Sequence, residues 1–129
     1  MADDMVNVRY MVDDVDAAVD FYTRHFGFTV RSNSAPAFAD VVRGKLRLLL
    51  SGPASSAGRP MPDGARPRPG GWNRVEFIVE DLAAEAEKLR GAGLKFRNEI
   101  VTGPGGKQIL LEDPSGNPIE LFQPADRQT

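Results

Sequence analysis

The chain contains no cysteine, a single histidine and no long apolar run. Without cysteine it can form no disulfide bond, zinc ribbon or thiol nucleophile. Its apolar runs, such as residues 48–50, are too short to cross a bilayer, and the N-terminal residues lack the basic start and apolar core of a signal peptide. A net charge of -2 gives no basic surface for nucleic acid and no polybasic membrane arm. We therefore expect a cytoplasmic protein that binds neither nucleic acid nor membranes.

The composition is that of an ordinary globular protein. Of 129 residues, 41% are hydrophobic and 26% are charged, which suits one domain over residues 1–129. The 13 glycines and 10 prolines indicate many turns.

An internal repeat organises the chain, because residues 10–18 resemble residues 77–85. Each copy begins with alternating apolar residues, which predicts a half-buried strand. Asp14 and Asp81 follow these strands at positions suited to cap a helix, and Gly27 and Gly93 are placed to end the two helices. The first helix is expected to bury Val15, Ala18, Val19, Tyr22 and Phe26, and the second Leu82, Ala86 and Leu89.

Three short strands are predicted after each helix, at residues 28–32, 37–42 and 46–50 and then at residues 95–100, 108–112 and 118–122. Each half then has the order βαβββ. The first module covers about residues 5–51 and the second about residues 72–124. Residues 52–71, rich in proline and glycine, form a linker or flap.

Two segments carry a resemblance to a known family. VDDVDAAVDFYTRHFGF and LLEDPSGNPIELFQP resemble the first helix region and the closing hairpin of the glyoxalase, bleomycin-resistance and extradiol-dioxygenase (vicinal oxygen chelate) superfamily. The resemblance implies an α+β fold in which tandem βαβββ modules form a curved, cup-shaped mixed sheet with helices outside. It also implies a small organic molecule as ligand and a homodimer as the assembly.

Strand alternation predicts which side chains face the cup. If the alternating apolar residues pack toward the helices, their neighbours point the other way; these apolar residues include Val6, Val8, Tyr10, Phe77 and Leu121. The candidate ligand-binding residues are then Asn7, Arg9, Trp72, Arg74, Glu76, Glu120 and Phe122.

Metal-dependent members of the family draw one His or Glu ligand from each of four strands, and the resemblance places three of these positions at Asn7, Arg74 and Glu120. The fourth belongs to the strand at residues 46–50, which contains no acidic residue or histidine. Arg74 cannot ligate a cation. With only Glu120 left, we expect no metal site and no cofactor, and a divalent metal only if these ligand positions are misassigned. His25, in the first helix, is expected to lie outside the cup.

Several alternatives stay open at this point. Arg74 with Glu120, and Arg9 with Glu76, could form ion pairs that fill the former metal position, or could contact a ligand directly. Trp72 could be a core residue or a stacking surface for a planar ligand. For the function, the first interpretation is a metal-free protein that binds a small molecule, of the kind that sequesters a drug or metabolite. The alternative is a lyase, isomerase or dioxygenase, with Glu120 or Glu76 as candidate catalytic residues.

Overall fold

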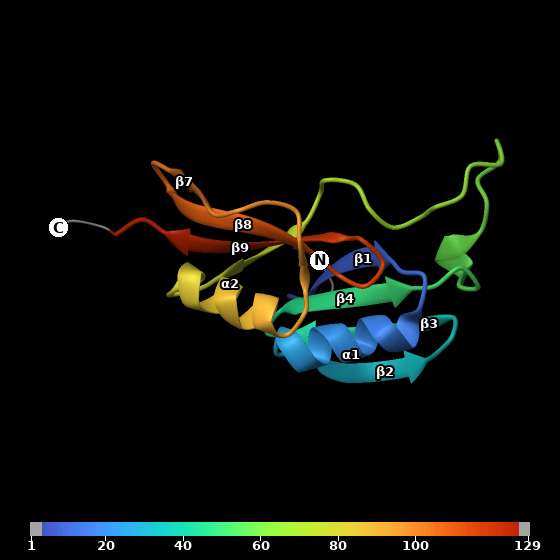
Figure 1. The fold of residues 1–129 in the computed structure, drawn as a ribbon. Helices are drawn as coiled ribbons and strands as arrows, with labels where there is room; N and C mark the ends of the chain where they lie inside the picture. Colours follow the sequence, from blue (N-terminus) through green and yellow to red (C-terminus); the bar gives the residue numbers. More distant parts are fainter. Residues whose placement is uncertain (1–3, 127–129) are drawn as a thin grey trace. The chain divides into compact units, whose positions relative to one another are not determined.

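The computed structural model describes residues 4–126, and within that range the protein is a mixed α+β structure with two α-helices and two mixed sheets (Figure 1). It divides into two compact units: the N-terminal unit ends at Gly70 and the C-terminal unit begins at Gly71. Neither helix in the described range has the length and apolarity needed to span a membrane. The single domain expected over residues 1–129 stays a prediction, and its ends lie outside the described residues.

The N-terminal unit contains a four-stranded sheet in the order β1-β4-β3-β2. Strands β1 (Val6–Met11) and β4 (Leu46–Ser51) are parallel, whereas β3 (Phe38–Arg43) is antiparallel to both β4 and β2 (Thr29–Ser34). Helix α1 (Val15–His25) joins β1 to β2, and a short 3-10 helix, η1 (Ser56–Gly58), follows β4. This is the predicted βαβββ order.

Helix α1 begins and ends as the sequence predicts. Oδ1 of Asp14 accepts a hydrogen bond from the backbone N–H of Ala17 at 3.1 Å, which satisfies one of the free donors of the first turn. Gly27 follows the helix with a φ of 70°, a conformation that glycine adopts without strain. The helix therefore stops where the chain turns into β2.

The buried side chains of α1 pack on one face of the sheet. Val15, Ala18, Phe21 and Tyr22 are buried, and the Tyr22 ring meets Tyr10 of β1 edge-on, with centroids 6.4 Å apart. The predicted stripe missed Phe21, and Val19 is only half-buried. The prediction that Val6 packs under the helix is wrong, because Val6 is 58% exposed.

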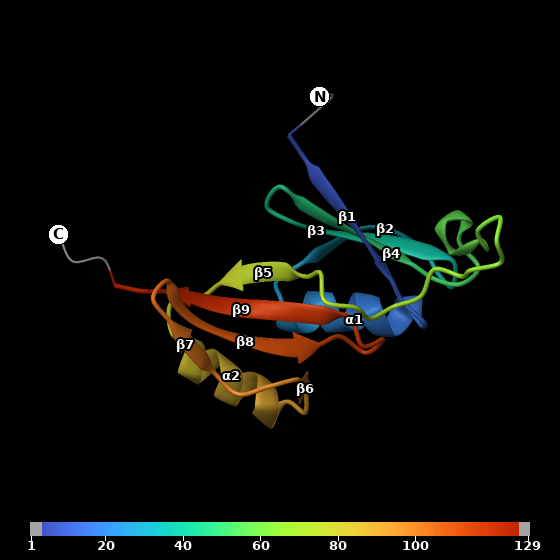
Figure 2. The same cartoon turned by 90° about the horizontal axis from the view of Figure 1, so that it is seen from above.

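The C-terminal unit repeats this plan. Its sheet has the order β5-β9-β8-β6, with β7 paired to β8. The strands are β5 (Val75–Ile78), β6 (Lys95–Phe96), β7 (Val101–Gly103), β8 (Gly106–Glu112) and β9 (Pro118–Pro124). Helix α2 (Leu82–Gly91) lies along one face of β8 and β9 in Figure 2 and buries Leu82, Ala86 and Leu89, as expected. Oδ1 of Asp81 caps it through the N–H of Ala84, at 3.1 Å.

The strand predicted at residues 95–100 is wrong for most of its length. Only Lys95 and Phe96 form strand β6 beside β8, and β7 does not begin until Val101. In the intervening segment the N–H of Arg97 donates to the carbonyl oxygen of Leu110 at 2.9 Å, and Oδ1 of Asn98 then takes the place of a strand carbonyl by accepting from the N–H of Leu110 at 2.9 Å. Because these contacts reach across the sequence, local alternation gives no sign of them.

Candidate functional site

In the C-terminal unit, two glutamates lie side by side on the sheet face opposite α2. Strands β5 and β9 are parallel, and their register places Glu76 beside Glu120 and Ile78 beside Phe122. The alternate positions Phe77, Ile119 and Leu121 are buried on the α2 side. The predicted alternation therefore holds in this unit, and Glu76, Glu120 and Phe122 share one face.

Arg74 holds the carboxylate of Glu120 with two hydrogen bonds. Its Nε and Nη2 both donate to Oε1 of Glu120, at 3.0 and 2.8 Å, and its Nη1 donates to the carbonyl oxygen of Trp72 at 3.1 Å. The side chain of Glu120 is only 7% exposed and that of Arg74 is 27% exposed. The ion pair that the sequence predicts is thus present and partly buried, and it connects β9 to the segment that precedes β5.

Glu76 completes the group by hydrogen bonding to Glu120. This hydrogen bond raises the pKa of Glu76 to about 7 from an ordinary value of 4.5; desolvation and the charge of Glu120 act in the same direction, and the charge of Arg74 opposes them. Two neighbouring carboxyl groups cannot both ionise freely, so a proton is retained between them. Near neutral pH the pair can therefore accept or release a proton.

Trp72, whose carbonyl oxygen accepts the hydrogen bond from Arg74, has an exposed indole. Trp72 is 70% exposed, so it is not a core residue. The guanidinium carbon of Arg97 lies 4.8 Å from the centre of the ring, which is cation–π distance. One tryptophan side chain is thus held in place while remaining open to solvent.

Arg97 is the residue that fixes this tryptophan, and the sequence analysis did not single it out. Its Nε donates to Oε2 of Glu112 at 2.7 Å, while Nη1 and Nη2 donate to the carbonyl oxygens of Gly71 and Gly116, each at 2.9 Å. The first of these hydrogen bonds lowers the pKa of Glu112. Arg97 thus ties the start of the unit to the β8–β9 turn.

The candidate residues of the N-terminal unit lie on the sheet face opposite α1. Asn7 and Arg9 are exposed, whereas Tyr10 is buried on the helix side. Nη1 of Arg9 donates to Oγ of Ser51 at 2.9 Å. Arg9 and Glu76 each have a partner within their own unit, and both alternatives for them, an ion pair with each other or direct contact with a ligand, stay predictions.

Asp40 on β3 is a second residue that the sequence analysis missed. It is 2% exposed, it accepts hydrogen bonds from Arg31 Nη1 (3.1 Å) and from Ser32 Oγ, and Nε of Arg47 lies 3.7 Å from its Oδ2. A signal was available, because Ala39 and Val41 are apolar and fully buried, and alternation places Asp40 on the opposite face.

These residues do not fit the divalent metal that the family resemblance implies. The two ligand positions expected in the C-terminal unit are Arg74 and Glu120. Arg74 is a guanidinium that donates hydrogen bonds to the carboxylate of Glu120. In the N-terminal unit Asn7 lies in register with Arg47, which puts a second arginine beside the third position. Within residues 4–126, no group of three or more His, Cys, Asp or Glu side chains is arranged to hold a metal ion.

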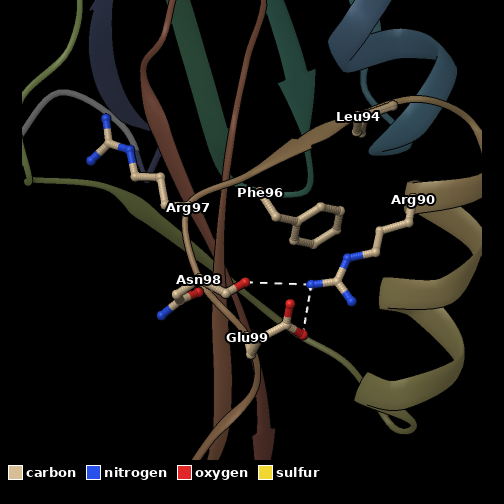
Figure 3. A pocket seen from close by; sticks show the side chains of 6 residues that line it. All are labelled: Arg90, Leu94, Phe96, Arg97, Asn98 and Glu99. Carbon is tan, nitrogen blue, oxygen red and sulfur yellow. Dashed lines mark hydrogen bonds and ion pairs between the residues drawn. The ribbon is translucent and has the colours of Figure 1, made fainter.

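An open pocket of about 520 Å³ lies elsewhere in the C-terminal unit, between the end of α2 and the segment after β6 (Figure 3). Arg90 extends over the ring of Phe96 at 4.7 Å and forms an ion pair with Glu99 at 3.1 Å. Arg97 also lines the pocket, but its side chain is directed away from Phe96 and Glu99 (Figure 3). None of the residues that the sequence predicts to bind a ligand lines this pocket, so the candidate site remains the Arg74–Glu120 group.

Comparison with known proteins decides the family. The Glyoxalase/Bleomycin resistance protein/Dioxygenase superfamily matches residues 5–121, almost the whole chain. The chain belongs to this superfamily. The mixed α+β fold of this superfamily member, with two helices and two mixed sheets, matches solved structures of the same superfamily, which confirms the resemblance seen in the sequence.

Three solved structures illustrate the range of this superfamily. The chain is 25% identical to a glyoxalase/bleomycin resistance/dioxygenase superfamily member from Sphaerobacter thermophilus (TM-score 0.72; 92% of this chain and 95% of that one). It is 22% identical to lactoylglutathione lyase from Agrobacterium tumefaciens (TM-score 0.71; 92% of each chain). It is 24% identical to TnmS3, an antibiotic binding protein from Streptomyces sp. (TM-score 0.72; 97% and 99%). Among curated proteins, no sequence matches.

Proposed function

We propose that this superfamily member binds a small organic molecule without a metal ion, on the sheet face that carries Arg74, Glu76 and Glu120. The observation that carries the proposal is the Arg74–Glu120 ion pair, which occupies with a guanidinium and its carboxylate partner the positions that a metal would need. Trp72 supplies the apolar part of the site, because an exposed indole held at one face can stack on a planar ligand.

Two structural neighbours represent the two classes of function that the family suggests. TnmS3 is named as an antibiotic binding protein, and the Agrobacterium tumefaciens protein as a lyase. We favour the binding protein, because the metal positions are filled by a salt bridge. The homodimer and the cytoplasmic location expected from the sequence stay predictions.

One observation favours an enzyme as the second candidate. The pKa of Glu76, raised to about 7 by its hydrogen bond with Glu120, suits a group that takes up and returns a proton near neutral pH. In that reading Glu76 is the general base and Glu120, held by Arg74, positions it. A lyase or isomerase reaction that moves one proton would use this pair without a metal.

The test is a screen of planar aromatic fragments read by the fluorescence of Trp72, which is unambiguous because the chain has one tryptophan. True ligands should quench or shift the emission. Because the Trp72→Ala variant has no tryptophan fluorescence, its ligand binding is compared with that of the unaltered protein by calorimetry. Binding to the variant should be weaker by about 1–3 kcal/mol, the range of an aromatic anchor.

Phe96→Ala is the matched control, since it removes an aromatic ring from the separate pocket beside Arg90 and should leave fragment binding unchanged. Equal binding by the Trp72→Ala variant would show that the site lies elsewhere. Recovery of a fragment in chemically altered form, with turnover, would replace the binding protein by the enzyme.

A further inference from the structure

The N-terminal sheet concentrates positive charge on the face opposite α1. Arg9, Arg31 and Arg47 have their side chains on this face, and Asp40 is the only acidic residue in the four strands. Two of these three guanidinium groups, those of Arg31 and Arg47, lie within 4 Å of the Asp40 carboxylate. The excess of positive charge is unusual for a partly buried surface, because each unpaired charge is costly to desolvate.

Asp40 does not form a hydrogen bond with each of its neighbours. Ser32 and Arg31 already donate hydrogen bonds to its two carboxylate oxygens. Nε of Arg47 lies 3.7 Å from Oδ2 of Asp40, and among residues 4–126 this buried Nε has no hydrogen-bond partner. A buried N–H without an acceptor is a rare feature that requires an explanation, such as an acceptor supplied by a bound molecule.

Two exposed donors lie next to Arg47. The β1–β4 register places Asn7 directly beside it, and Arg9 follows two residues later on the same face of β1. The hydrogen bond from Arg9 goes to the neutral hydroxyl of Ser51, so its charge is not compensated there. Arg47, Arg9 and Asn7 therefore present two positive charges and an amide donor over neighbouring positions of two strands.

We propose that Arg47, Arg9 and Asn7 form a binding site for an oxyanion, the carboxylate or phosphate group of a small molecule. An oxyanion would accept hydrogen bonds from both guanidinium groups, since arginine is well shaped to bind carboxylate and phosphate. A cationic group would be repelled at this face, and a neutral one would leave the charge uncompensated. This proposal uses residues of the N-terminal unit only and does not depend on the function proposed above.

The test is an NMR titration of the labelled full-length chain with benzoate, with inorganic phosphate and with benzamide, at constant ionic strength. Benzamide has the shape of benzoate without its charge. Saturable shifts of the arginine Nε–H signal of Arg47 and of the Asn7 amide are expected with an oxyanion and not with benzamide. The oxyanion that binds more tightly identifies a carboxylate or a phosphate ester as the natural group.

Arg9→Gln and Arg47→Gln should each weaken this binding at least fivefold. Arg24→Gln is the matched control, because it removes the same charge from an exposed ion pair on α1 and should leave binding unchanged. If Arg47→Gln fails to fold, Arg9→Gln decides alone, since Arg9 is exposed. Benzamide binding as tightly as benzoate, no saturable shift with either anion, or equal binding by Arg9→Gln would each overturn the proposal.

Discussion

Nε and Nη2 of Arg74 both donate to the same oxygen of Glu120, at 3.0 and 2.8 Å. The two residues stand at positions where metal-dependent relatives are expected to bring ligands. Because Glu120 is almost fully buried, its charge depends on this guanidinium, and removing Arg74 would leave a buried carboxylate without its counter-charge. A substitution that removes Arg74 therefore requires a matching substitution that removes the charge of Glu120.

This dependence predicts strong coupling in a double-mutant cycle. Arg74→Met alone should cost about 3 kcal/mol of unfolding free energy, because it leaves Glu120 buried and unpaired, whereas adding Glu120→Gln should recover part of that loss. Chemical denaturation gives the unfolding free energies of the unaltered protein, the two single variants and the double variant. Arg90→Met with Glu99→Gln is the matched control: this ion pair is largely exposed and its coupling should stay below about 1 kcal/mol. Additive effects at Arg74 and Glu120 would contradict the prediction.

The same pair predicts that the purified protein binds no divalent metal tightly. Elemental analysis of protein prepared without chelator should find far less than one zinc, nickel, iron or manganese ion per chain. Arg74→His would supply a neutral ligand and free Glu120, so this variant should bind a divalent ion more tightly than the unaltered chain. A stoichiometric metal in the unaltered protein would show that the ligand positions have been assigned to the wrong residues.

The sequence predicts the parts of this site that lie on regular strands. Alternation places Glu76 and Glu120 on one face, and the repeat indicates which strands carry them, because a strand's two faces follow from every second residue. The same rule fails at Val6, which lies at the start of β1 and is exposed there.

Arg97 could not be predicted, because its role comes from irregular segments. It contacts the backbone of Gly71 and Gly116 and the side chain of Glu112, each of which lies at least 15 residues from Arg97 in the sequence. No local pattern encodes such contacts. Asp40, by contrast, could have been found, since it interrupts a strand whose neighbouring residues are apolar.

The raised pKa of Glu76 predicts a specific pH dependence of stability. The folded protein retains a proton between pH 4.5 and about 7 that the unfolded chain has released, so the contribution of Glu76 is full below pH 4.5 and is lost as the pH rises toward 7. Unfolding free energies measured from pH 4.5 to 8 should fall less steeply for Glu76→Gln than for the unaltered protein. Glu87→Gln, on the exposed side of α2, should leave the slope unchanged. The pKa of Glu112 is lowered, so its contribution to the free energy of unfolding changes only below pH 4.5 and does not affect the slope measured from pH 4.5 to 8.

Arg97 predicts how firmly Trp72 is held. Its three hydrogen bonds fix the guanidinium, and the indole of Trp72 packs on it at 4.8 Å, although the tryptophan is 70% exposed. Arg97→Met removes both the cation–π contact and the link to the Gly71 carbonyl, so the ring should move more freely. Time-resolved fluorescence anisotropy should show a larger fast component for this variant, and Arg90→Met should not change it, because that arginine contacts Phe96 instead. If the site requires an indole that is fixed before the ligand arrives, Arg97→Met should also weaken fragment binding while Trp72 remains present. An unchanged anisotropy decay would mean that Arg97 does not restrain the ring.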